Sequence, residues 1–153
     1  MVRVAGGKEA AMAETIRRVD YFYVVTPDKP GEGARALAAL REAGVNLLAF
    51  TGFPKGQRSQ LDFVPADPAA FVQAAKKARW KLSPRKTAFL VEGEDRIGAF
   101  ADVATRLAAA KINVTATNAV CAGAGRYGAI VWVKPRDVNR AAKALGIGGG
   151  PVS

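Results

Sequence analysis

The sequence of 153 residues contains no histidine and a single cysteine, Cys121. Histidine is the commonest general base and transition-metal ligand, so its absence lowers the expectation of an enzyme and of a metal or other cofactor. One cysteine excludes an internal disulfide and favours a reducing compartment, which we take to be the cytoplasm. No apolar run approaches the roughly 18 residues that a membrane span needs, and no signal-peptide pattern opens the chain. We therefore predict a cytoplasmic protein that is not an enzyme and has no membrane segment.

Basic residues are abundant, and the formal net charge is +10. The densest basic segment, residues 76–86, carries no acidic side chain. It is typical of a helix end, where cations complement the helix dipole, followed by a solvated linker. The alternative is a contact with nucleic acid, which we regard as the less favoured interpretation.

Hydrophobic periodicity predicts alternating strands and helices, punctuated by proline and glycine. In the first half, strands are predicted at residues 19–26, 45–53, 60–64 and, as a short final strand, 80–82; helices are predicted at 31–43 and 69–79. In the second half, strands are predicted at 87–91, 112–120 and 127–133, and helices at 97–110 and 135–145. We divide the chain into an N-terminal arm or short helix (1–18), two units (19–84 and 85–146) and a mobile tail (147–153).

The two halves are related by an internal repeat at a constant offset of 67 residues without a gap. Matching positions include Phe22 and Phe89, Asp28 and Asp95, Gly31 and Gly98, Asn46 and Asn113, Val64 and Val131, and Pro68 and Pro135. The Asp, Gly, Asn and Pro matches fall at turns, where backbone geometry requires particular residues. The repeat therefore indicates two copies of one structural unit.

The order of elements in each copy predicts an α+β fold of two ferredoxin-like βαββαβ units. Such a unit forms an antiparallel sheet with both helices on one face and its first and third strands in the centre. A unit of about 65 residues has little core of its own. We therefore expect the units to pack side by side, within one chain or between chains, and expect a homodimer.

The turn between the first strand and first helix of each copy carries a short motif. It reads Asp28-Lys29-Pro30-Gly31 in the first copy and Asp95-Arg96-Ile97-Gly98 in the second. Glycine allows a sharp turn, and the N–H groups of the following helix favour an anion such as a ligand carboxylate. Asp28 and Asp95 are candidates for capping that helix or for facing a ligand ammonium. A purely structural role as cap and turn remains the alternative.

With Gly44-Val45-Asn46 after the first helix and Lys111-Ile112-Asn113 after its counterpart, these turns resemble the ACT domain family. The resemblance covers roughly residues 20–146. It implies a regulatory module that binds an amino acid or related metabolite at the junction of two units, and that changes assembly or binding to a partner enzyme. The ligand-binding residues it implies are Asp28, Lys29, Pro30, Gly31, Asn46, Leu47, Asp95, Arg96, Ile97, Gly98, Asn113 and Val114. The first copy is expected to be the better site because it retains Pro30 and Gly44.

Two other functions remain open. Residues 125–132 faintly resemble the aromatic third strand of RNA-recognition motifs, although Ile130 stands at the central stacking position. A structural partner subunit without a ligand is the third alternative.

Overall fold

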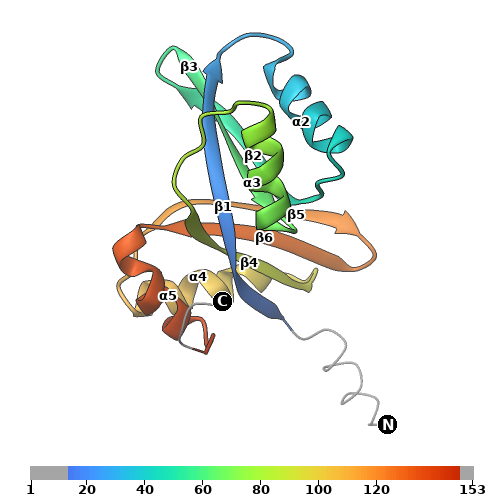
Figure 1. Cartoon of the computed structure of the whole chain (residues 1–153). Coiled ribbons are helices and arrows are strands. Elements are labelled where there is room, and N and C mark those ends of the chain that lie inside the picture. Colours follow the sequence, from blue (N-terminus) through green and yellow to red (C-terminus); the bar gives the residue numbers. More distant parts are fainter. Residues whose placement is uncertain (1–13, 149–153) are drawn as a thin grey trace. The chain divides into compact units, whose positions relative to one another are not determined.

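The structure, a computed structural model, describes residues 14–148 (Figure 1). It divides into two compact units. The first unit is residues 20–86, and the second unit combines residues 14–19 with residues 87–148. Strand β1 (Thr15–Pro27) therefore contributes residues to both. Each unit joins antiparallel strand pairs to two α-helices, which confirms the predicted α+β class.

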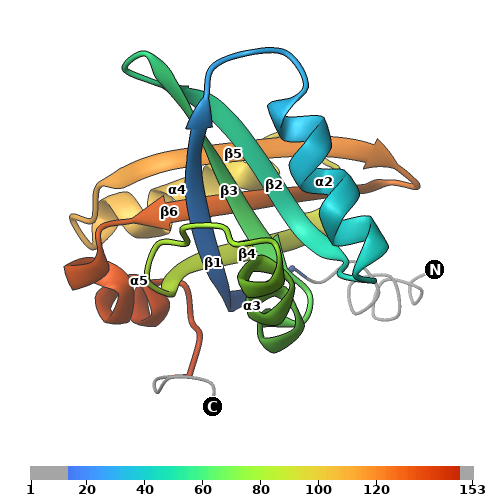
Figure 2. The same ribbon diagram turned by 45° about the horizontal axis from the view of Figure 1, so that its top comes forward.

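The first unit contains the end of β1, then α2 (Glu32–Glu42), β2 (Leu47–Lys55), β3 (Arg58–Pro65) and α3 (Pro68–Lys77). Strands β1 and β2 both pair antiparallel with β3, so β3 is central. Both helices lie over one face of these strands (Figure 2). Their core is aromatic: Phe63 is fully buried and lies 5.4 Å from Phe71 and 5.6 Å from Trp80 between ring centroids.

The residues after α3 follow β1 without forming the strand predicted at 80–82. The N–H of Ser83 donates to the carbonyl of Tyr23 at 2.9 Å, and the N–H of Tyr23 donates to Oγ of Ser83 at 2.9 Å. One of these two bonds uses a side chain, so the segment does not continue as a regular ladder. Trp80 and Leu82 still pack against the first unit's core.

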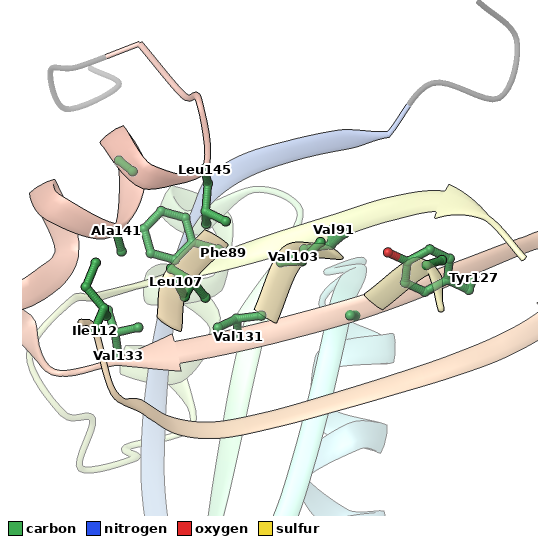
Figure 3. Close-up of a cluster of buried hydrophobic side chains, with 13 residues drawn as sticks. Phe89, Val91, Val103, Leu107, Ile112, Tyr127, Val131, Val133, Ala141 and Leu145 are labelled. Atoms are coloured by element: carbon green, nitrogen blue, oxygen red, sulfur yellow. The ribbon is translucent and has the colours of Figure 1, made fainter. Parts of the chain in front are cut away.

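The second unit contains β4 (Lys86–Glu94), α4 (Ala99–Ala109), β5 (Val114–Gly123), β6 (Arg126–Val133), a 3-10 turn η1 (Pro135–Asp137) and α5 (Val138–Ala144). Strands β4 and β5 both pair antiparallel with β6, and β4 has β1 as its other neighbour. Side chains from β4, α4, β6 and α5 converge in one cluster (Figure 3). Within residues 14–148, no helix is long and apolar enough to cross a membrane.

The N-terminal boundary of the second unit differs from the prediction. Residues 15–18 were expected to belong to an arm or short helix, but they form the start of β1. Ile16 packs against the second unit's core. Val19 is also buried, although a strand points it to the opposite face from Ile16. At the other end, Ile147 also packs against this core. The rest of the predicted arm and tail, residues 1–13 and 149–153, lies outside the described residues.

The gapless repeat is wrong in the third strand. Phe22 pairs with Phe63 in the first unit, and Phe89 pairs with Val131 in the second. Val131 is therefore equivalent to Phe63, not to Val64, and the offset in β6 is 68. The cause is a register shift between Cys121 and Gly123 in β5, where one extra residue enters the strand. Because side chains alternate faces along a strand, this one-residue correction changes which side chains correspond.

Candidate functional site

The turn that begins α2 has the backbone geometry that the motif predicts. Gly31 occupies the N-cap position with a φ of 94°, in the left-handed region that glycine enters without strain. No side chain caps this helix. The carboxylate of Asp28 does not turn toward the helix N–H groups; its Oδ1 accepts a hydrogen bond from Oγ of Ser59 at 3.0 Å. Lys29 and Pro30 are exposed.

The turn that begins α4 repeats this geometry with different partners. Gly98 is the N-cap residue with a φ of 76°, and again no side chain caps the helix. A hydrogen bond to the Asp95 carboxylate, together with some burial, raises the pKa of the Cys121 thiol. Ile97 is fully exposed, and the guanidinium of Arg96 donates to Asp102 Oδ2 at 2.7 Å. Neither Asp28 nor Asp95 therefore serves as a helix cap.

The asparagines of the predicted site lie at the far end of each helix. Asn46 and Leu47 follow α2, and Asn113 and Val114 follow α4. Each of these helices has 11 residues and is about 16 Å long. Figure 2 shows the chain entering and leaving α2 at opposite ends. Within one unit, the structure does not bring the turn and the asparagine together.

Asn46 and Leu47 line an open cavity of about 400 Å³ at the end of α2. Its other lining residues are Leu37, Leu40, Arg41, Gly44 and Val45. Gly44 ends the helix with a φ of 71°, and Lys111 occupies the same conformation after α4 with a φ of 59°. The replacement of Gly44 by Lys111 in the second copy thus leaves the helix end unchanged in shape.

A second cavity, of about 290 Å³, lies in the second unit beside the start of α4. We call it the Tyr127 cavity; it is lined by Glu14, Gly93, Glu94, Arg96, Ala99, Asp102, Arg106 and Tyr127. Only Arg96 among these was predicted as a site residue. Four of its five charged side chains form two pairs: Arg96 with Asp102, and Arg106 with the carboxylate of Glu14.

Tyr127 is the buried polar group of this cavity. Its side chain lies at one end of the second unit's core (Figure 3). The residue is only 8% exposed, and no described group accepts a hydrogen bond from its hydroxyl. Burial raises the pKa of Tyr127, as do the charges of Glu14 and Asp102, while Arg96 and Arg106 lower it. All four of these charged residues line the cavity, so the hydroxyl faces its charged groups.

Gly93 explains how the tyrosine ring fits beside β4. Gly93 and Tyr127 are directly opposite in the β4–β6 register. A Cβ atom on Gly93 would approach Cε1 of Tyr127 to 2.9 Å, a distance that real Cβ atoms essentially never show. A glycine inside a strand is a signal of such a close approach. The sequence Glu92-Gly93-Glu94 carries this signal. The gapless repeat did not predict the site, because it aligned Tyr127 with Gln60.

The RNA alternative depended on aromatic residues of β6. Ile130, at the central stacking position, is not aromatic and offers no ring on which a base can stack. The basic segment behaves as the helix-end interpretation predicts: Lys76 and Lys77 occupy the last turn of α3. Among residues 14–148, no group of three or more Cys, Asp or Glu side chains is arranged to hold a metal ion.

No protein-family model matches the sequence, and no curated protein does either. Solved structures do share its fold. A protein from Bacteroides thetaiotaomicron superposes with a TM-score of 0.73 at 14% identity, over 86% of this chain and 88% of that one. The ligand-free regulatory subunit of aspartate kinase from Thermus thermophilus gives 0.57 at 18% identity, over 87% and 94%. The corresponding subunit from Thermus flavus gives 0.55 at 20% identity, over 88% and 94%.

The chain shares the fold of these regulatory subunits. At these identities the likeness establishes architecture and leaves the ligand and partner of this chain to be argued from its own residues.

Proposed function

We propose that this protein is a regulatory, non-enzymatic module that binds a free amino acid or a closely related metabolite. Binding would change its assembly or its affinity for a partner such as an enzyme subunit. A ligand has that effect only if it binds one state of the protein more tightly than the other. The aspartate kinase neighbours, described as regulatory subunits, support a regulatory role for the same fold.

The observation that carries the proposal is the pair of glycine turns. Gly31 and Gly98 hold equivalent left-handed N-cap positions, and neither helix has a side-chain cap. The first-turn N–H groups of α2 are therefore available to an anionic group such as a carboxylate. In α4, the N–H groups of Ala99 and Ala101 already donate to the carbonyls of Arg96 and Gly98. The same turn occurs in both copies of the repeat. The need to begin a helix does not explain it well, because a capping side chain would stabilise the start of a helix better.

The separation of turn and asparagine adds a geometric condition. Since Gly31 and Asn46 lie at opposite ends of α2, a ligand that contacts both kinds of residue needs the turn of one unit and the strand start of another. We propose that such a pairing of ACT-type units, in a homodimer, completes the site. Gel filtration at several protein concentrations tests this part, and a monomer at all concentrations with full ligand affinity contradicts it.

A thermal-shift panel of amino acids tests the function. A specific ligand at a hundred times its Kd should stabilise the protein by about 2.7 kcal/mol. Gly31→Val forces a β-branched residue to a positive φ at the turn and should abolish or strongly reduce that response.

Gly146→Val is the matched control for this substitution. Gly146 also has a positive φ, 77°, and open space around it, but it follows the end of α5 and belongs to neither turn. The control should therefore lose similar stability and keep the ligand response. A full response in Gly31→Val removes that turn from the site, and a lack of response to every amino acid in the unmodified protein overturns the proposal.

A further inference from the structure

The second unit contains a cavity lined by both basic and acidic side chains, which fits a ligand that carries both charges better than a simple anion. We propose that the Tyr127 cavity binds a small zwitterion, a free α-amino acid, within the second unit and without residues from another unit. This inference rests on the proposed function and differs from it in location: the ligand lies between α4 and the ends of β4 and β6, not between two units.

The Tyr127 hydroxyl supplies the first argument. Folding has removed this O–H from water, because the residue is 92% buried, and no described group accepts its hydrogen bond. A buried donor without an acceptor is uncommon in folded proteins and calls for a missing partner. A carboxylate oxygen is a strong acceptor for a phenolic O–H and would satisfy it.

The charges around the cavity supply the second argument. Its lining contains two guanidinium groups, Arg96 and Arg106, and three carboxylates, Glu14, Glu94 and Asp102. A simple anion would meet more negative than positive groups. The carboxylate of a zwitterion can lie near the guanidinium groups and the Tyr127 hydroxyl. Its ammonium group can lie near a carboxylate of the protein, so both charges of the ligand are matched. The volume of about 290 Å³ is at the small end of ligand pockets, which suits a single amino acid.

The tyrosine hydroxyl has no counterpart at the equivalent position of the first unit, which is the third argument. Thr26 and Ser59 are opposite each other in the β1–β3 register, as Gly93 and Tyr127 are in the β4–β6 register. Ser59 already donates its hydroxyl to Asp28. The position that leaves a free hydroxyl in one copy is thus internally satisfied in the other, and we expect one ligand per chain.

Isothermal titration of the full chain with the panel of amino acids tests the inference. The unmodified protein should bind a ligand at one per chain. Tyr127→Phe removes only the hydroxyl and should weaken binding by about tenfold or more, the usual effect of losing a hydrogen bond to a charged group. Tyr127→Phe should not lower the urea midpoint of unfolding, because the lost hydroxyl had no partner to lose.

Tyr23→Phe is the matched control, since Tyr23 lies on β1 in the first unit and outside the cavity. It should bind the amino acid as the unmodified protein does. Equal affinity of Tyr127→Phe and the unmodified protein overturns the cavity site and leaves the proposed function standing. Two ligands per chain, lost one at a time in Gly31→Val and Gly98→Val, also overturn it in favour of the turns. Absence of binding by any amino acid overturns both proposals.

Discussion

The two units build the same turn and then use it differently. In the first, the aspartate of the turn accepts a hydrogen bond from Ser59 of the neighbouring strand, while the hydroxyl of Thr26, opposite Ser59, is buried without a hydrogen-bond partner. In the second, the position of Ser59 is taken by Tyr127, whose hydroxyl is buried without an acceptor beside a cavity. The backbone of a repeat can thus be retained while equivalent positions carry different polar groups: the hydroxyl of Ser59 has a partner in the first copy, and the hydroxyl of Tyr127 has none in the second.

The cores of the two units differ in the size of the side chains at equivalent positions. The largest effect that we expect on the free energy of unfolding follows from this difference. Phe63 and Val131 are equivalent and fully buried. Phe63→Ala should lower the free energy of unfolding of the first unit by about 3–5 kcal/mol, since it leaves a large cavity among three rings. Val131→Ala removes only two methyl groups and should cost about 2 kcal/mol.

Urea unfolding followed by tryptophan fluorescence measures this contrast, because Trp80 lies in the first unit and Trp132 in the second. Single-tryptophan versions assign each transition. If Val131→Ala destabilises as much as Phe63→Ala, the equivalence of the two positions does not extend to their packing.

The elements that the sequence predicted are those set by local chemistry. Helix α4 was expected from its periodicity, and the turn before it from the sharp bend that Gly98 allows, and both are present. The antiparallel pairing and central position of β3 and β6 followed from the order of elements.

The features that the sequence did not reveal depend on contacts distant along the chain. Residues 15–18 were predicted to belong to an arm or short helix, yet they extend β1, which lies beside β4. The sequence did not predict the Tyr127 cavity, because a bulge in β5 shifts the repeat by one residue from that point on. A comparison at the constant offset of 67 ignores the bulge and aligns Tyr127 with Gln60. It therefore does not show that Tyr127 lies opposite Gly93 across the β4–β6 pair. The bulge itself is set by the pairing of β5 with β6, which a comparison of the two halves at one fixed offset does not contain.

A tyrosine in each unit has a raised pKa, and this provides the second test. Burial raises the pKa of Tyr21 to about 12, with a further contribution from the charge of Asp62. Between pH 10 and pH 12, Tyr21 keeps its phenolic proton in the folded protein and loses it in the unfolded chain, where its pKa is near 10. Stability from this group is therefore complete below pH 10 and falls by up to about 2 kcal/mol as the pH rises toward 12.

Ultraviolet absorbance of phenolate detects the titration, and Asp62→Asn should shift it to lower pH. The carboxylate of Asp62 is the second cause of the raised value after burial. An unchanged titration in Asp62→Asn would show that burial alone accounts for Tyr21.

The ends of the paired helices give a third, smaller contrast. Gly44 and Lys111 share a positive φ, which glycine adopts freely and lysine adopts at a cost. Lys111→Gly should raise the free energy of unfolding by about 1 kcal/mol, and Gly44→Lys should lower it by a similar amount. Chemical denaturation of both variants checks the pair. Effects of the same sign in both would mean that side-chain contacts of Lys111 outweigh its backbone strain.

The smallest expected change in stability, Ser59→Ala, separates the two proposed sites. Its hydrogen bond to Asp28 is exposed, so the variant should lose only about 0.5 kcal/mol in chemical denaturation. Its effect on ligand affinity is more informative, because Ser59 holds the carboxylate of Asp28 at the first turn. If that carboxylate receives the ligand ammonium, Ser59→Ala releases it and weakens binding several-fold. If the amino acid occupies the Tyr127 cavity, the variant binds as tightly as the unmodified protein, since Ser59 lies in the other unit.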